Sequence, residues 1–271
     1  MTSRSILPLA LIALGAASPS HAKPADTTAA PVTAEDQSNV GLALDRAQLL
    51  HRYDQAAWHT TDALTSDAPE VALATIRGWV VTPDGGDYRV TYYSGDPGVE
   101  HRAVYSAVWT GGTNVRDRKL RGVDDNQLSA EETRLAAASD AVAEEGPLRC
   151  TDRRFNRVVL PRATIDGADL VYLLTPQTET GSIPFGGHHR AEVKDGKLVS
   201  IRSFSKTCLD MPLEKKAEAL IVSHLLDPTP TEIHFFSVFA AKKPIYVLTT
   251  SNERIWVAES SNGQARVRIA K

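Results

Sequence analysis

Residues 181–208, GSIPFGGHHRAEVKDGKLVSIRSFSKTC, predict two strands joined by a tight turn. Lys194-Asp195-Gly196 is typical of a three-residue hairpin loop whose last position takes a left-handed conformation that favours glycine. Such a loop makes Val193 face Lys197, and successive side chains of each strand then point to opposite faces. One face carries His189, Ala191, Val193, Val199 and Ile201, and the other carries His188, Arg190, Glu192, Ser200, Arg202 and Phe204. The division into an apolar and a polar face supports this register and predicts an antiparallel sheet.

The same register separates the two neighbouring histidines. It places His189 opposite Ile201 on the apolar face and His188 opposite Arg202 on the polar face. Rings on opposite faces cannot easily bind one metal ion together. We therefore expect His189 to be a buried histidine with one or two hydrogen bonds. Alternatively, His188 or His189 is a catalytic base beside an unidentified carboxylate, and Gly186-Gly187 lets a substrate approach the backbone.

Sequence patterns on both sides of this hairpin predict the rest of the fold. Strand-like runs cover residues 70–83, 87–94, 101–112, 149–163, 168–178, 231–239, 244–250, 253–260 and 264–270. Helical spacing of apolar residues predicts helices over residues 41–64, 129–145 and 210–228. We expect an α+β fold, with mainly antiparallel sheet (hairpins plus a C-terminal four-strand meander) and about three packed helices.

Local capping patterns set the expected ends of these helices. Asn39 is the expected N-cap of the first helix, and Ser129 with Glu132 forms an S-x-x-E capping box at the start of the second. Pro212 indicates the start of the third helix, and Asp227-Pro228 indicates its end.

The N-terminal residues differ from the rest of the chain. Arg4, the apolar run 6–17, and the small residues Ser20 and Ala22 are typical of a secretory signal peptide over residues 1–22. The run is too short to cross a hydrocarbon core, which requires about 20 helical residues. We therefore expect a soluble protein, exported through a signal peptide to the periplasm or the extracellular medium, with no transmembrane segment.

The composition of residues 23–39 and the order of the predicted elements after them divide the mature chain into three parts. Residues 23–39 contain few side chains that can fill a core and are expected to form a disordered leader. An α+β section with helix, three strands and helix is expected over residues 40–147, and a β-rich section with one helix over residues 148–271. Both sections together are short enough to form one continuous domain, so one domain and two domains both remain open.

Cys150 and Cys208 are the two cysteines of the chain. An even number of cysteines in an exported protein predicts a disulfide, and two free thiols are the alternative. The loop that such a bond closes corresponds to roughly 3 to 4 kcal/mol of stabilisation in the chain-entropy model.

A disulfide would bring the arginines near Cys150 beside the hairpin. The expected ligand-binding face comprises Arg149, Arg153, Arg154, His188, Arg190 and Arg202. The planar donor fork of arginine suits carboxylate or phosphate groups. The alternative is a solvated face whose arginines pair with acids such as Asp152 and Glu192.

Known catalytic patterns are missing from the sequence. Ser203 to Lys206 matches S-x-x-K, but side chains three positions apart on a strand point to opposite faces. Zinc, P-loop, nucleophile-elbow and C-x-x-C signatures are absent, so we expect no cofactor and no metal. The net charge of −3 has the wrong sign for a nucleic-acid binder.

These observations favour a non-catalytic binding or accessory module of the cell envelope with an Arg-rich anion-binding face. Its expected partner is an anionic envelope ligand or another envelope protein. The alternative functions are a hydrolase that uses His188 or His189, and a purely structural protein or protein–protein interaction partner.

Overall fold

The computed structural model describes residues 31–143 and 145–270 of the chain. The expected signal peptide and residues 23–30 of the expected leader lie outside the described residues. The helices are α1 (Ala34–Asp67), α2 (Glu70–Leu73), α3 (Ala130–Asp140) and α4 (Glu232–Ala241).

Within the described residues, the strands form three four-stranded sheets and one short pair. The N-terminal sheet comprises β1 (Ile76–Asp84), β2 (Asp87–Ser94), β3 (Arg102–Gly111) and β4 (Asn114–Leu120), in that order. The central sheet has the order β5 (Asn156–Leu160), β6 (Asp169–Leu174), β8 (His189–Lys194) and β9 (Lys197–Ser203). The C-terminal sheet comprises β11 (Leu220–His224), β12 (Ile245–Thr249), β13 (Arg254–Ser261) and β14 (Gln264–Ile269). β7 (Ser182–Pro184) pairs with β10 (Asp210–Pro212), and the α+β class expected from the sequence is confirmed.

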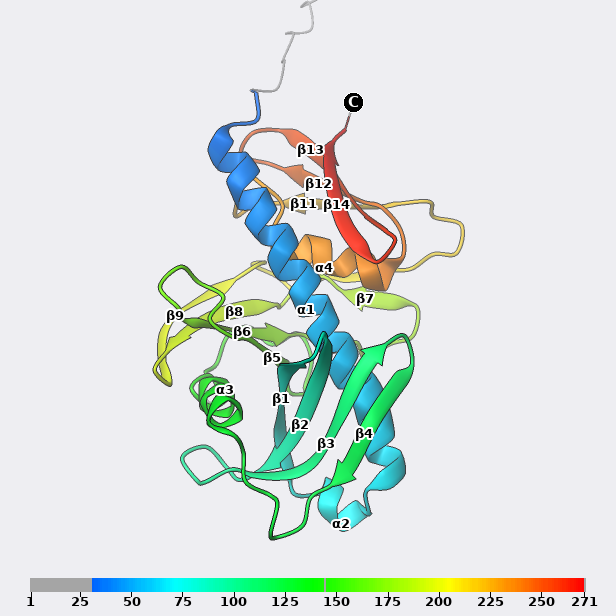
Figure 1. Cartoon of the computed structure of the whole chain (residues 1–271). Coiled ribbons are helices and arrows are strands. Elements are labelled where there is room, and N and C mark those ends of the chain that lie inside the picture. Colours follow the sequence, from blue (N-terminus) through cyan, green and yellow to red (C-terminus); the bar gives the residue numbers. More distant parts are fainter. Residues whose placement is uncertain (1–30, 144, 271) are drawn as a thin grey trace, which may run out of the picture.

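Helix α1 contacts both the C-terminal sheet and the N-terminal sheet (Figure 1). It runs from the C-terminal sheet, past α4, to the N-terminal sheet. One hydrophobic cluster takes Leu50 and Tyr53 from this helix, Val90 from the N-terminal sheet, and Leu170 from the central sheet. The sections 40–147 and 148–271 therefore share a hydrophobic core.

Helix α1 begins earlier than we expected. Its N-cap is Thr33, whose hydroxyl accepts a hydrogen bond from the Asp36 amide at 3.0 Å. The Asp36 carboxylate accepts one in return from the Thr33 amide, also at 3.0 Å. This reciprocal pair forms a capping box with aspartate at the third helical position. Asn39 is therefore inside the helix, and residues 34–39 of the expected leader are helical.

Two C-terminal segments have the opposite secondary structure from the one we expected. Residues 210–228, expected to be a helix, contain the strands β10 and β11, and residues 231–239, expected to be a strand, contain α4. β11 and β12 are parallel, and parallel neighbours need a crossover connection, which α4 supplies. Most of α4 is buried, so its sequence lacks the polar face that distinguishes a helix from a strand.

The boundaries of other elements also differ from the prediction. The polar residues 114–120 form a fourth strand, β4, which is almost fully exposed at the edge of its sheet. An exposed edge strand lacks the apolar alternation that identifies a strand in sequence. By contrast, the expected Ser129 and Glu132 capping box starts α3.

The β8–β9 hairpin has a shorter loop than the one we expected. Its two loop residues, Asp195 and Gly196, have φ values of 50° and 71°, the left-handed pair typical of a type I′ turn. Lys194 therefore pairs with Lys197, and a bulge beside Glu192 shifts the remaining register. His189 faces Ser203 instead of Ile201, and Arg202 faces Arg190 instead of His188. The expected apolar face is confirmed for His189, Ala191 and Val193, whereas Val199 and Ile201 are exposed.

Candidate functional site

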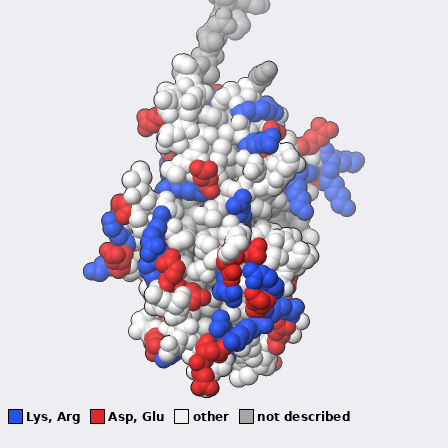
Figure 2. Space-filling view, in the orientation of Figure 1, with Lys and Arg blue, Asp and Glu red and all other residues white. Residues whose placement is uncertain are grey.

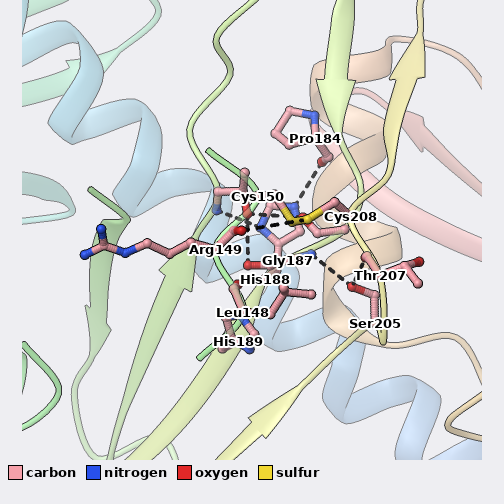
Figure 3. Close-up of a disulfide and its surroundings, with 12 residues drawn as sticks. Leu148, Arg149, Cys150, Pro184, Gly187, His188, His189, Ser205, Thr207 and Cys208 are labelled. Carbon is pink, nitrogen blue, oxygen red and sulfur yellow. Dashed lines mark hydrogen bonds between the residues drawn. A yellow bond between two sulfur atoms is a disulfide. The ribbon is translucent and has the colours of Figure 1, made fainter. Parts of the chain in front are cut away.

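The disulfide between Cys150 and Cys208 joins the segment after α3 to the loop between β9 and β10. The two Cα atoms are 5.3 Å apart, and the bond lies against Gly187 (Figure 3). A Cβ on Gly187 would lie 2.3 Å from the sulfur of Cys150, and one on Gly186 would lie 2.4 Å from the Thr207 carbonyl oxygen. The glycines are thus required for close packing against the disulfide and its loop.

His188 is buried and both of its ring nitrogens are bonded. Nδ1 accepts a hydrogen bond from the Thr175 amide at 3.1 Å, so the ring proton lies on Nε2 and is donated to the Pro184 carbonyl at 3.0 Å. Burial lowers the pKa of His188 to about 4. The ring is therefore neutral and fixes the backbone around β7.

His189 is also buried and fully bonded. Its Nε2 donates to the Leu148 carbonyl oxygen at 2.9 Å, and its Nδ1 accepts from the Ser203 hydroxyl at 2.9 Å. Phe155 packs edge-on against the ring, with 5.6 Å between the ring centroids. Burial lowers the pKa of His189 below its ordinary value. This ring fixes residues 148–155, which we call the cationic loop, to the central sheet.

The strand arginines of the expected face have internal partners. Arg190 is largely buried and pairs with Glu232 of α4, which also accepts a hydrogen bond from the Tyr172 hydroxyl at 2.9 Å. Arg202 donates to Asp227 at 2.8 Å and lies 4.8 Å from the ring centroid of Phe204. Both guanidinium groups are thus neutralised by carboxylates within the fold.

The three arginines of the cationic loop differ from these two. Arg149, Arg153 and Arg154 are exposed, and their guanidinium groups form no ion pair within the described part of the chain. The Arg149 guanidinium is 6.0 Å from the ring centroid of Phe155, and its side chain points away from the disulfide (Figure 3). The structure therefore divides the six expected residues into three exposed, unpaired arginines, two paired arginines and one buried histidine.

Most other basic residues lie among acidic ones. On the face in Figure 2, Lys and Arg alternate with Asp and Glu over the N-terminal sheet. Arg116, for example, pairs with Asp87 at 3.1 Å and with Asp84 at 3.4 Å. Unpaired arginines clustered on one short loop are unusual in this molecule.

A second candidate site was not expected from the sequence. A hollow of about 110 Å³ lies between the β9–β10 loop and the segment that follows β11. Its lining comprises Phe185, Phe204, Ser205, Lys206, Thr207, Leu209, Val222, Ser223, His224, Leu225, Leu226, Ile233 and His234. His224 and His234 contact each other edge-on, with 4.6 Å between the ring centroids. We expected His224 on a helix and His234 on a strand, so the contact between the two rings was not expected.

Hydrogen bonds assign a donor or an acceptor role to one nitrogen of each of these two rings. His224 Nε2 donates to Asp227 at 2.9 Å. Burial alone would raise the pKa of Asp227, but the hydrogen bonds from His224 and Arg202 outweigh this effect and lower the pKa to about 2. His234 Nδ1 accepts from the Thr231 amide at 3.0 Å, so its proton lies on Nε2. Burial, with the neighbouring His224, lowers the pKa of His234 to about 3.

Comparison with known proteins gives no family for this chain. No protein-family model matches it, and neither does any curated protein. Residues 31–143 and 145–270 contain no helix that is long and apolar enough to cross a membrane. Within the same residues, no group of three or more His, Cys, Asp or Glu side chains is arranged to hold a metal ion.

Proposed function

We propose that this protein is an exported, non-catalytic binding module whose cationic loop binds an anionic component of the cell envelope. The observation that carries the proposal is the set of exposed, unpaired arginines Arg149, Arg153 and Arg154. Each guanidinium offers a planar set of donors that matches carboxylate and phosphate oxygens. The ligand class is therefore a surface or polymer that presents several such groups.

The attachment of the cationic loop supports the proposal. The Cys150–Cys208 disulfide, the His189 hydrogen bond to Leu148 and the packing of Phe155 on His189 all fix the loop backbone. A fixed backbone reduces the conformational entropy that is lost when the loop binds a ligand. The disulfide also supports export, because such bonds persist in oxidising compartments.

A hydrolase that uses His188 or His189 has less support. The four ring nitrogens of these residues already bond to backbone groups and to the Ser203 hydroxyl. A general base needs a ring nitrogen within reach of the substrate proton. We therefore favour binding over catalysis at this hairpin.

The test compares the wild type with the triple variant Arg149→Ala/Arg153→Ala/Arg154→Ala. Binding is measured by co-sedimentation with phosphatidylglycerol vesicles and with phosphatidylcholine vesicles, and by fluorescence anisotropy with labelled polyphosphate. The vesicles and the soluble polymer distinguish a membrane surface from a free phosphate chain. Each basic residue near an anionic surface contributes about 1 kcal/mol, so the variant should bind on the order of 100-fold more weakly.

The matched control is Lys215→Ala/Lys216→Ala/Arg266→Ala, which removes three positive charges from exposed positions elsewhere. It should retain most of the binding if the cationic loop is the site. Equal losses in the two triple variants would indicate a nonspecific effect of net charge. Neither that result nor the absence of binding to every anionic probe is compatible with the proposal.

A further inference from the structure

Strand β11 forms an open edge of the C-terminal sheet. It pairs only with β12 in the described part of the chain, and the pairing is parallel. The Leu220 amide bonds to Pro244, and the His224 carbonyl accepts from Thr250, so alternate residues of β11 direct their backbone groups toward β12. The amide and carbonyl groups of Ile221 and Ser223 then point away from the sheet. Such free groups are a template for another strand.

The hollow described above lies beside this edge. Val222, Ser223 and His224 of β11 line one wall, and the β9–β10 loop lines the other. Apolar side chains surround the opening, because Leu209, Leu225 and Leu226 are 40%, 66% and 38% exposed. An apolar cavity of roughly 150 Å³ accommodates a benzene ring, so a hollow of about 110 Å³ matches one aliphatic side chain.

Two imidazoles line the hollow, and each has one ring nitrogen without a hydrogen bond among the described residues. His224 and His234 are both 4% exposed. Among the described residues, nothing bonds to His224 Nδ1 or to the proton on His234 Nε2. The carbonyl of a peptide unit that enters the hollow would accept the proton on His234 Nε2.

The positive charge of Lys206 near the opening favours a ligand that carries a negative charge. Lys206 lines the hollow, is exposed and has no ion pair within the described residues. An acidic residue of the ligand would pair with it. The other edge of the same sheet, β14, carries Arg266 and Arg268, and Arg266 has no ion pair among the described residues, so charge disfavours the pairing of β14 of a second copy with this edge.

We propose that β11 and the adjacent hollow form a docking groove for an extended segment of a partner protein. The segment adds to β11 as a strand, places one aliphatic side chain in the hollow and directs an acidic residue toward Lys206. Main-chain hydrogen bonds supply affinity in this mode of recognition, and the pocket supplies specificity. The groove shares no residue with the cationic loop, so the two sites are tested separately.

The probe is a pool of fluorescent ten-residue peptides with leucine at the centre, aspartate at one other position, and valine or threonine elsewhere. A second pool has lysine in place of aspartate, and a third has N-methyl groups on alternate amides, which remove backbone donors. Binding is followed by fluorescence anisotropy. We expect the aspartate pool to bind about tenfold more tightly than either of the others, because each lacks an interaction that the groove supplies.

Two protein variants locate the binding. Ser223→Pro removes an outward amide without removing a bond to β12, and it should weaken binding about tenfold. Lys206→Glu should reverse the preference between the aspartate and lysine pools, whereas the control Lys216→Glu should leave it unchanged. Thermal unfolding of each variant verifies that it folds, and the N-methylated pool tests the same hydrogen bonds on wild-type protein.

Three outcomes would overturn the proposal. The first is the absence of binding to the aspartate pool, and the second is equal binding of the N-methylated pool. The third is a wild-type dimer in sedimentation equilibrium that Ser223→Pro dissociates, which would assign the edge to a second copy. The triple variant of the cationic loop, Arg149→Ala/Arg153→Ala/Arg154→Ala, should bind these peptides as tightly as the wild type does.

Discussion

Single glycines determine how closely the disulfide can approach the central sheet. Gly187 has a φ of 73°, and the space that a Cβ would occupy already contains the Cys150 sulfur. Gly112 also has a positive φ, 55°, but nothing lies within 4 Å of the corresponding Cβ position. Both positions therefore require a positive φ, but only Gly187 lacks the space for a Cβ atom.

Replacement of each glycine by alanine separates these two effects. Gly112→Ala should lower the free energy of unfolding by about 1 kcal/mol, the usual effect of a left-handed L-residue. Gly187→Ala should lower it by a further 1 to 3 kcal/mol, roughly the effect of overpacking. Urea unfolding of the oxidised proteins measures both values. Equal losses would show that the contact with Cys150 has no energetic effect.

At the residue scale, the sequence predicted the environment of His189 but not that of His188. Strand alternation placed His189 on the apolar face, and its ring is fully buried. His188 precedes β8, where alternation no longer applies, and its ring bonds to Thr175 and Pro184 instead. These partners belong to other segments of the chain, so local sequence contains no signal for them.

At the element scale, α1 depends on a cap that lies close to its start in sequence. The Thr33–Asp36 capping box satisfies amide groups of the first turn. Asp36 also lies 3.3 Å from a guanidinium nitrogen of Arg254, which connects this turn to β13. The cap therefore stabilises the contact between α1 and the C-terminal sheet.

Thr33→Ala should lower the free energy of unfolding by about 1 kcal/mol, because the Asp36 amide loses its acceptor. Thr33→Ser retains a hydroxyl and should remain within a few tenths of a kcal/mol of the wild type. Hydrogen exchange should accelerate in the first turn of α1 in the alanine variant alone. If the alanine and serine variants have the same stability, the hydroxyl does not cap the helix.

Elements with local signals were predictable, and those defined by tertiary contacts were not. The capping box of α3 lies within four residues of sequence, and the structure contains it. The secondary structures of β11 and α4 were predicted the wrong way round. The reason is that β11 pairs in parallel with β12, a strand that follows α4 in the chain. Similarly, the bulge beside Glu192 changed the hairpin register without a signal in the local sequence.

At the scale of the whole molecule, long-range pairs decide which charges remain available for ligands. Arg190 and Glu232 are 42 positions apart, and Arg202 and Asp227 are 25 apart. Sequence proximity to the cysteines suggested one continuous basic face, but the fold neutralises these two arginines. The cationic loop and the β11 groove remain as separate candidate sites.

The buried histidines also make the stability of the whole molecule depend on pH. A histidine of the unfolded chain binds a proton below about pH 6.5. Burial keeps the folded rings neutral, since it lowers the pKa of His188 to about 4 and that of His234 to about 3. Between about pH 4 and pH 6.5 these two histidines therefore bind more protons in the unfolded state than in the folded state. Their contribution lowers the free energy of unfolding as the pH falls through this range.

The variant His188→Asn should reduce this pH dependence. Asparagine offers an oxygen to the Thr175 amide but loses the bond to Pro184, so the variant should be less stable than the wild type at pH 7.5. On acidification to pH 5, it should lose about 2 kcal/mol less than the wild type, because one histidine no longer takes up a proton on unfolding. Urea unfolding at a series of pH values measures both effects. Parallel curves for the two proteins would mean that His188 is protonated equally in the folded and unfolded states.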